Sequence, residues 1–475
     1  MRFDFDHDTR RRLGYRLIDH VNQYFSSLPD RPVQLPLEKR VFPPLDAPLP
    51  EEGADAARVL DEVAGELVEK GFHVPSAHYY GLMNCTPTYT AVLAEALVAA
   101  LNPQLASPAH SQMASAIERQ TLRWIGSRVG WSGGPFDGTF TSGGNEANFT
   151  GLALALAHHF PQAIEEGVAA IGATPVLYTS SEAHHSIDKS VGLLGLGRRA
   201  LRRIAVTDRL QLDPQKLGAA ITEDLAAGHR PFCVVATAGT TNSGAVDDLI
   251  ALAHIARRHT LWLHLDGAYG AAAIFSDRHR DAVRGIERCD SVTLDPHKWL
   301  AMPFAAGVIL TSHPETLERT FAVRTPYMPR ATELESFKVS AQWSRRMNSL
   351  KLYLTLRVHG RRAYEELIDR QFTLAQRFLA WVEKSEAFEL AAPLYLPIVN
   401  FRVKAAGRSE EDIAARNEAI VEAVTRDGQS WISSTRVAAR SVIRMMLISY
   451  LTEERHLDEL QQSLITAAQD TQTRQ

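Results

Sequence analysis

Between residues 174 and 312 the chain repeats one pattern, in which short apolar segments alternate with longer helix-like stretches. Segments that are apolar along their whole length are typical of strands in a sheet that helices cover on both faces. We therefore predict an α/β protein with a largely parallel sheet, and functional residues at its strand ends, where such sheets bind ligands. The segments are TPVLYTS (174–180), RRIAVT (202–207), PFCVVATAG (231–239), TLWLHLDGAYG (260–270), SVTLD (291–295) and AAGVILTS (305–312).

Two further parts flank this region. Residues 1–86 contain two helix-like stretches joined by a proline-rich strip, with little core of their own, so we expect them to pack on another body such as a second subunit. Residues 361–475 begin and end with helical patterns and contain alternating strand patterns between them. We predict an N-terminal helical dimerisation segment (1–86), a large domain (87–360) and a small C-terminal α+β domain (361–475).

The bulk properties exclude several classes of protein. A net charge of −4, from 51 basic and 55 acidic residues, favours neither nucleic acid nor an anionic membrane. No apolar run approaches the roughly 18 residues of a membrane span, and the first residues lack the apolar core of a signal peptide. Cys85, Cys233 and Cys289 have neither disulfide-like nor metal-ligand spacing. We expect a cytoplasmic globular protein without a bound metal.

An aspartate ends one of the apolar segments. Asp266 closes LWLHLD and is followed by Gly267 and Ala268, which leave room for a flat ring against the backbone. A carboxylate at a buried strand end is costly without a cationic partner. The protonated pyridine nitrogen of pyridoxal phosphate would supply that cation. A helix cap or an arginine-paired structural aspartate explains Asp266 about as well from this segment alone.

A histidine–lysine pair follows the next apolar segment. Lys298 comes directly after His297 in DPHKWL, and a surface ion pair is the usual role of a lysine. A partly buried lysine is instead suited to form a Schiff base with pyridoxal phosphate. Together with Asp266 this predicts an enzyme that performs carbanion chemistry on amino acids. The apolar neighbours that argue for burial of Lys298 are Leu294, Trp299, Leu300, Met302 and Phe304.

Three weaker motifs are compatible with the same cofactor. A glycine-bearing turn opens an amphipathic helical pattern at 138–160, where unpaired N–H groups and the helix dipole would bind phosphate. His184 follows a predicted strand and could stack on a heterocycle or transfer a proton. Thr241 could reach a ring substituent. Ordinary turns and helix starts explain each motif at least as well. The residues of the glycine-bearing turn are Ser142, Gly143, Gly144 and Asn145.

In their order along the chain, TSGGNEAN, EAHHS, ATAGTTNSG, HLDGAYG and DPHKW resemble the group II pyridoxal-phosphate-dependent amino acid decarboxylases. That family includes the aromatic-L-amino-acid, histidine, glutamate and cysteine-sulfinate decarboxylases. The resemblance implies fold type I, with a mostly parallel seven-stranded sheet covered by helices in the large domain and a small C-terminal α+β domain. It also implies a homodimer whose active sites lie at the subunit interface.

The resemblance assigns roles to individual residues. Lys298 would bind the cofactor covalently, and Asp266 would pair with its pyridine nitrogen. Ala268 and His184 would lie on the two faces of the ring, with Thr241 near it. Tyr327, in FAVRTPYMPRATELE, aligns with a mobile-loop tyrosine that protonates the carbanion after CO2 leaves. Gly144, Asn145 and His297 would contact the phosphate, and Ser142 and Gly143 of the same turn would also bind the cofactor.

The sequence departs from the family pattern in three places. Asp295 replaces an asparagine that many animal members have near the phosphate, so we expect its side chain to turn away or to bond elsewhere. HYYGLMNCTPT (78–88) differs from the animal HPxFF pattern at the substrate carboxylate. The loop at 101–110 has fewer bulky aromatic residues than its counterpart in animal aromatic decarboxylases, where it reaches into the partner's active site.

These features predict the decarboxylation of an amino acid substrate with an aromatic or imidazole side chain. Tyr79, Tyr80, Leu82 and Leu105 could line an aromatic pocket, although core packing explains them nearly as well. Ser344 resembles histidine-specific members, and we expect the following Arg345 and Arg346 to be structural. Alternatives are an acidic amino acid (glutamate, aspartate or cysteine sulfinate) or diaminobutyrate as substrate; aldehyde synthesis, transamination or lysis of a phosphorylated amino alcohol; and an inactive paralogue that binds the cofactor.

Overall fold

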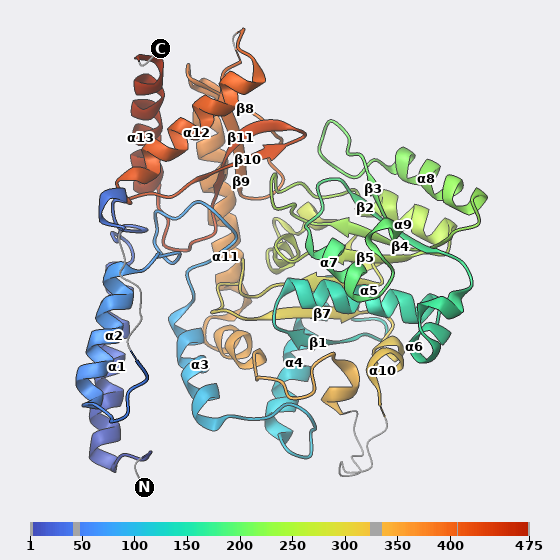
Figure 1. Cartoon of the computed structure of the whole chain (residues 1–475), viewed down its shortest axis with the longest axis horizontal. Helices are drawn as coiled ribbons and strands as arrows, with labels where there is room; N and C mark the ends of the chain where they lie inside the picture. Colours follow the sequence, from blue (N-terminus) through green and yellow to red (C-terminus); the bar gives the residue numbers. More distant parts are fainter. Residues whose placement is uncertain (1–2, 41–47, 324–334, 406, 474–475) are drawn as a thin grey trace.

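The computed structural model describes residues 3–40, 48–323, 335–405 and 407–473 (Figure 1). Its central feature is a seven-stranded sheet in the order β1-β7-β6-β5-β4-β2-β3. The β2, β3, β4, β5 and β6 strands are parallel, and β7 is antiparallel to both β6 and β1. The strands are β1 Asp137–Thr141, β2 Pro175–Ser180, β3 Leu201–Ile204, β4 Arg230–Thr237, β5 Trp262–Asp266, β6 Ser291–Leu294 and β7 Gly307–Thr311.

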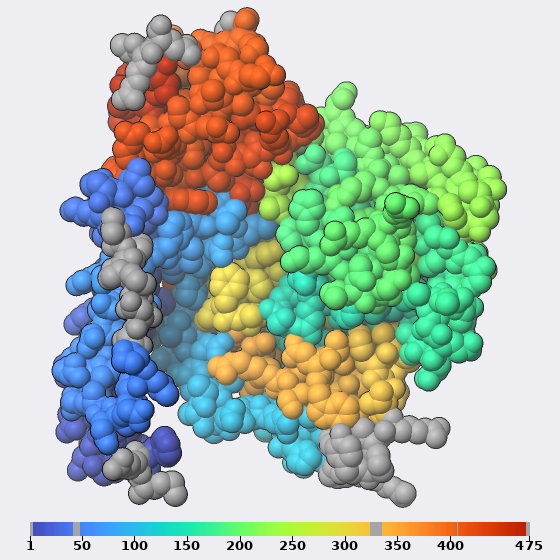
Figure 2. Space-filling model, in the orientation of Figure 1, coloured from blue at the N-terminus to red at the C-terminus, as the bar shows by residue number. Residues whose placement is uncertain are grey.

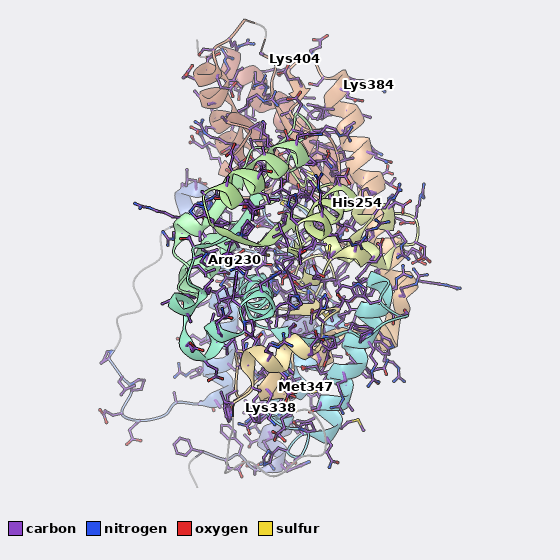
Figure 3. All side chains as sticks on the ribbon, turned by 90° about the vertical axis from the view of Figure 1, so that its right-hand side faces the viewer. Arg230, His254, Lys338, Met347, Lys384 and Lys404 are labelled. Atoms are coloured by element: carbon purple, nitrogen blue, oxygen red, sulfur yellow. The ribbon has the colours of Figure 1, made fainter. Side chains whose placement is uncertain are left out.

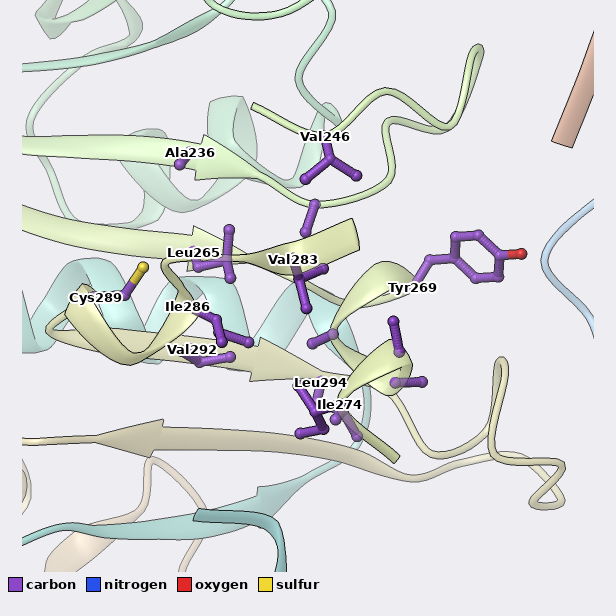
Figure 4. Close-up of a cluster of buried hydrophobic side chains, with 14 of the residues drawn as sticks. Ala236, Val246, Leu265, Tyr269, Ile274, Val283, Ile286, Cys289, Val292 and Leu294 are labelled. Carbon is purple, nitrogen blue, oxygen red and sulfur yellow. The ribbon is translucent and has the colours of Figure 1, made fainter. Parts of the chain in front are cut away.

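Helices cover both faces of this sheet, as predicted. The α4, α8 and α9 helices pack on one face with Val234 and Leu265, and α5, α7 and α10 pack on the other with Val235. Figure 4 shows part of the first face, where Val283 and Ile286 lie against the strands. The helices are α3 Tyr89–Leu101, α4 Gln112–Val129, α5 Gly144–His159, α6 Gln162–Glu166, α7 Ser186–Leu193, α8 Pro214–Ala226, α9 Leu249–Arg258 and α10 Glu315–Phe321.

The α5 helix differs from the prediction, because it is not amphipathic. From Ala147 to Ala157 nearly every side chain is buried, since α7 and α10 cover the face that the sheet leaves free. The helix runs antiparallel to β5. The His158 ring at its C-terminal end lies 5.3 Å from the ring of Trp262, where β5 begins. Consequently the N-terminal end of α5 lies over the C-terminal end of β5.

The C-terminal part is built on a second sheet, of four antiparallel strands in the order β10-β11-β9-β8. The α11 helix (Ser349–Lys384) leads into it and has one non-helical residue, Gly360 (φ 74°, ψ 171°), at the domain boundary that the sequence predicts. Side chains fill the space between the layers, and Lys384 and Lys404 lie at the end opposite Lys338 and Met347 (Figure 3). The other elements are β8 Phe388–Leu390, β9 Ile398–Val403, α12 Glu410–Arg426, β10 Ser433–Val437, β11 Arg440–Met446 and α13 Glu454–Thr473.

The N-terminal helices α1 (His7–Ser27) and α2 (Ala56–Lys70) form a column along one side of the molecule (Figure 2). Neither helix contains a buried residue. Several apolar side chains of α2 are exposed, among them Val63 (51%) and Leu67 (69%). The column therefore leaves an apolar surface uncovered in the single chain.

All three cysteines are free and buried. Burial raises the pKa of each thiol, to about 12 for Cys85. The Cys85 Sγ lies under the carbonyl oxygen of His297, to which it donates at 3.2 Å. Among the described helices, none is long and apolar enough to cross a membrane.

Candidate active site

The carboxylate that ends β5 is buried, and none of the described lysine or arginine residues forms an ion pair with it. Asp266 is 6% exposed, and its Oδ1 accepts the N–H of Ala268 at 3.2 Å. Gly267 must be glycine, because a Cβ there would lie 2.8 Å from the carbonyl oxygen of Thr293. Asp266 is thus a buried carboxyl group in a narrow turn, which fits the protonated ring nitrogen of pyridoxal phosphate.

The lysine lies in the turn that follows the neighbouring strand β6. Lys298 is half-buried, and its Nζ lies 3.3 Å from Oδ2 of Asp295. The Nε2 of His297 lies 3.6 Å from the same oxygen. Asp295 is 2% exposed, and its Oδ1 has no hydrogen-bond partner among the described residues. Of the two outcomes that we expected for Asp295, turning away or bonding elsewhere, the structure shows the second: the carboxylate lies between His297 and Lys298 and forms an ion pair with the lysine.

The residues around Lys298 are buried as predicted, with one exception. Trp299 and Leu300 are fully buried, and the Trp299 ring stacks on Tyr269 at 4.8 Å. Leu294 and Met302 are each 1% exposed. Phe304, however, is 58% exposed, because its ring lies outside the turn, 4.6 Å from the His297 ring.

The glycine-bearing turn meets both strand ends. A Cβ at Gly144, the first residue of α5, would lie 2.6 Å from Oδ2 of Asp295 and 3.1 Å from Cβ of Ala268. A Cβ at Gly143 would lie 3.2 Å from Cε1 of His297. The N-terminus of α5 can approach Asp295, Ala268 and His297 only because its two glycines carry no side chain. It therefore places free N–H groups and the positive end of the helix dipole beside His297, which suits a phosphate group.

The polar side chains of this turn behave differently from the prediction. The N–H and the hydroxyl of Ser142 both donate to Oε2 of Glu146, at 2.8 and 2.7 Å. Gln342 donates to the same carboxylate. The Ser142 hydroxyl thus already has an acceptor, while the Asn145 side chain is exposed. Glu146 was not singled out in the sequence, because a glutamate in the first turn of a helix is an ordinary capping residue.

His184 lies on an exposed turn before α7, close enough to Asp266 and Lys298 for their charges to act on it. Its Nδ1 accepts the N–H of Ser186 at 3.1 Å, so the proton of the neutral ring is on Nε2. The surrounding protein lowers the pKa of His184, while Asp266 raises it and Lys298 lowers it further. His184 is therefore neutral at physiological pH.

The threonine-rich turn after β4 is held by an arginine that sequence reasoning missed. Thr240 is structural, because its hydroxyl is hydrogen-bonded to that of Ser243 at 2.7 Å. The carbonyl oxygen of Thr241 accepts from Nη1 of Arg444 at 2.5 Å. Arg444 is 4% exposed, and no described acidic side chain forms an ion pair with it. Burial lowers the pKa of this guanidinium. The sequence shows Arg444 only as a single arginine within VIRMM, and its role becomes visible through its distant partner Thr241.

The remaining candidates fall into three groups: one outside the described residues, three in the core and one exposed. Tyr327 lies outside the described residues, and its role stays a prediction. Tyr80 and Leu105 are fully buried within hydrophobic clusters, and Tyr79 stacks on Trp431 at 5.4 Å, so core packing accounts for these three. Leu82 is 43% exposed.

Arg345 and Arg346, which are neighbours in the sequence, both form ion pairs, as expected of structural residues. Arg345 is 3% exposed, and its Nη2 donates to Oε1 of Glu118 at 2.6 Å. Arg346 donates to Glu95. Neither arginine is therefore available as the cation of a substrate pocket.

Comparisons with known proteins agree with this geometry. Aromatic-L-amino-acid decarboxylase of Bacillus atrophaeus is 30% identical over 467 residues, 97% of this chain and 95% of that protein. Human cysteine sulfinic acid decarboxylase is 35% identical over 280 residues, 58% of this chain and 56% of that protein. The crystal structure of Catharanthus roseus tryptophan decarboxylase in complex with L-tryptophan matches with a TM-score of 0.87 and 25% identity, covering 98% of this chain and 99% of that one.

The family model described as "Pyridoxal-dependent decarboxylase conserved domain" matches residues 38–404, more than half of the chain. The cofactor is accordingly pyridoxal 5'-phosphate, and the enzyme is a carboxy-lyase that acts on an amino acid. With buried Asp266 at the end of one strand and Lys298 after the next, the chain belongs to the pyridoxal-dependent decarboxylase family.

Proposed function

We propose that this enzyme converts an aromatic or imidazole L-amino acid to the corresponding amine and CO2. The observation that carries the proposal is the convergence of Asp266, Lys298 and the N-terminus of α5 at one edge of the sheet. Bound pyridoxal phosphate supplies an electron-withdrawing ring that stabilises negative charge at the α-carbon of an amino acid. The residues of the chain hold that ring and control the protons around it.

The roles of these residues follow from their surroundings. Lys298 would hold the cofactor covalently, and Asp266 would keep the ring nitrogen protonated. Gly143 and Gly144 would hold the phosphate through the N-terminus of α5, with His297 beside them. Asp295 balances the charge of the lysine before the covalent bond forms.

His184 and Thr241 complete the proposed site. His184 would lie against one face of the ring. In its neutral form it carries its proton on Nε2, which can donate a hydrogen bond near pH 7. Thr241 would border the ring, on a turn that Arg444 fixes through the Thr241 carbonyl. Ala268, 8% exposed, would present a small apolar surface to one face of the ring.

The substrate assignment depends on charge and on the relatives. Arg345 and Arg346 are paired with glutamates, so they offer no cation for an acidic side chain. One relative that is similar over nearly the whole chain, 30% identical, is named an aromatic-L-amino-acid decarboxylase. The Ser344 hydroxyl accepts from Nε2 of Gln104 at 2.7 Å, which ties it to the 101–110 loop. An acidic amino acid is the second candidate, because human cysteine sulfinic acid decarboxylase is 35% identical over 58% of this chain.

A substrate panel tests this assignment. We expect the highest kcat/KM for CO2 release with one of tyrosine, phenylalanine, tryptophan, dihydroxyphenylalanine or histidine. The comparison set is glutamate, aspartate, cysteine sulfinate and 2,4-diaminobutyrate. Faster turnover of an acidic or dibasic amino acid would refute the substrate class and leave the decarboxylase assignment intact.

Tyr327 is proposed to deliver the proton that replaces CO2 on the α-carbon. A general acid contributes roughly 10²–10⁴-fold to a rate. We expect Tyr327→Phe to lower amine formation about 100-fold, near the low end of that range because water can replace the phenol. Aldehyde and ammonia should rise as a share of product, measured by chromatography alongside CO2. An unchanged amine yield with no new aldehyde would refute the role.

We further propose that the enzyme is a homodimer of the reducing cytoplasm, with the second copy covering the apolar side of α2. Val63 and Leu67 are exposed and lie one helical turn apart. Leu67→Lys should therefore shift the size-exclusion elution towards the monomer and reduce activity. Glu69→Lys, at an exposed position of the same helix, should elute as the unaltered protein does. A fully active monomer would contradict the dimer.

A further inference from the structure

A buried line of hydrogen bonds crosses the large sheet beneath the proposed site. Trp262 Nε1 donates to Ser291 Oγ at 2.8 Å, and the same oxygen lies 2.8 Å from Nδ1 of His264. His264 Nε2 lies 3.1 Å from Oδ1 of Asn148, whose Nδ2 donates to Ser186 Oγ at 3.0 Å. Each of these five side chains is at most 2% exposed. The line joins β6, β5, α5 and the start of α7.

Every hydrogen bond in this line has its donor on the Trp262 side and its acceptor on the Ser186 side. Trp262 can only donate, so the Ser291 hydroxyl accepts from it and is free to donate to Nδ1 of His264. Burial lowers the pKa of His264 to about 4, so the ring is neutral and carries one proton. That proton is on Nε2, where the acceptor is the Asn148 carbonyl oxygen. The Asn148 amide group then donates to Ser186.

The two central residues are adjacent to groups of the proposed site. His264 and Asp266 are alternate residues of β5 and face the same side of the sheet. Asn148 lies about one turn after Gly144, the first residue of α5. One turn further along the helix, a Cβ at Gly151 would lie 2.3 Å from Cε1 of His264, so the helix rests directly on this ring.

The line ends at the residue that holds His184. Ser186 is the first residue of α7, and its N–H donates to Nδ1 of His184. The residue before it, His185, makes no side-chain cap for the helix. The start of α7 is therefore tied to α5 through the Asn148–Ser186 hydrogen bond. A buried polar line of this kind fixes one geometry, which an apolar replacement would not specify.

We propose that Asn148, His264 and Ser186 are positioning residues that hold the His184 turn in place relative to Asp266 and the N-terminus of α5. They do not touch the reacting atoms. Their effect passes through Ser186, whose place on α7 sets both the position of the His184 ring and the nitrogen that carries its proton. The inference rests on the proposed role of His184.

The test compares three substitutions in one short helix. Ser186→Ala removes the hydroxyl that accepts from Asn148, and Ser186→Thr retains it. Ser190→Ala is the matched control, because Ser190 is 1% exposed on the same helix and its hydroxyl donates to the Ser186 carbonyl oxygen rather than to α5. We expect Ser186→Ala to lower kcat about tenfold, which corresponds to the loss of one hydrogen bond of about 1.4 kcal/mol. KM should change less than twofold.

Two further readouts separate positioning from stability. The surrounding protein lowers the pKa of His184, and a loosened turn would move the ring further into water, so that pKa should rise in Ser186→Ala. Because the neutral ring is the active form, the acidic fall in kcat should move to higher pH. The visible circular dichroism of the bound cofactor should weaken, while thermal unfolding stays within a few degrees of that of Ser190→Ala. Ser186→Thr should restore all three properties.

The possible results separate the positioning role of Ser186 from the role of His184 on which it rests. If Ser186→Ala matches Ser190→Ala in kcat, in the pH profile and in circular dichroism, the positioning role is refuted. His184→Gln is measured in parallel. A loss of activity in His184→Gln together with unaltered Ser186→Ala refutes only the positioning, whereas full activity of His184→Gln refutes the role of His184 itself. Asn148→Leu, if it folds, should reproduce the Ser186→Ala profile.

Discussion

Replacing Lys298 with alanine is expected to abolish amine formation and to remove the visible absorption band of the cofactor. Without an amine at the end of β6, the enzyme loses its covalent bond to pyridoxal phosphate and the group that would release the product. Loss of a covalent catalytic residue lowers turnover by about 10⁴-fold or more. Turnover is measured as CO2 release, and cofactor retention by absorbance after gel filtration.

A second substitution separates chemistry from charge. Lys298→Ala leaves the buried Asp295 without a cation, which lowers stability by itself. Lys298→Arg keeps a positive charge near that carboxylate but cannot form the covalent bond, so it should fold better and remain inactive. Lys216→Ala, at a lysine on the surface of α8, should keep both band and activity. An active Lys298→Arg enzyme would contradict the assignment.

Replacing Asp266 with asparagine should lower kcat by about 10²–10³-fold, the range typical for the loss of one preorganised electrostatic contact. The amide has nearly the same shape as the carboxylate but carries no charge to keep the ring nitrogen protonated. The cofactor should still bind, since the lysine and the glycine-bearing turn are unaltered. Steady-state kinetics with saturating cofactor measures the effect.

Asp247 provides the matched control for this substitution. It is 4% exposed at the same edge of the sheet, and its two carboxylate oxygens accept the N–H groups of Leu212 and Thr237. Burial raises the pKa of Asp247 to about 6. Asp247→Asn should lower the unfolding temperature and leave kcat within severalfold. If both substitutions reduce kcat equally, the charge of Asp266 has no special role.

The sequence predicted the sheet well where strands are apolar throughout. All six predicted segments contain strands, but β1 was missed because DGTFT reads as a polar turn. Its place is set by the partner strand: a Cβ at Gly138 would lie 2.3 Å from the carbonyl oxygen of Ile309. The burial of α5 on all sides was also not predictable, because α7 and α10 are placed by tertiary packing rather than by local pattern.

For the proposed site, residues with an unusual local pattern were found and residues in ordinary contexts were not. Asp266 and Lys298 stood out because a charge at the end of an apolar segment needs a reason. Asn148 and Arg444 did not, since an asparagine inside a helix and an arginine inside a strand gain meaning only from distant partners. Those partners are Ser186 and Thr241, 38 and 203 residues away along the chain. Single-sequence patterns contain no information on such pairings.

The burial of the three thiols makes them internal reporters of local opening. A thiol reacts as its thiolate, and the raised pKa values of Cys85, Cys233 and Cys289 leave almost none of it at neutral pH. Alkylation in the native state must therefore wait for the protein around each sulfur to open, and its rate measures the free energy of that opening. Cys85 reports on the turn that carries Lys298, through its contact with His297, whereas Cys233 reports on the middle of β4. Alkylation rates with and without pyridoxal phosphate would show how far the cofactor stiffens the turn and the sheet separately.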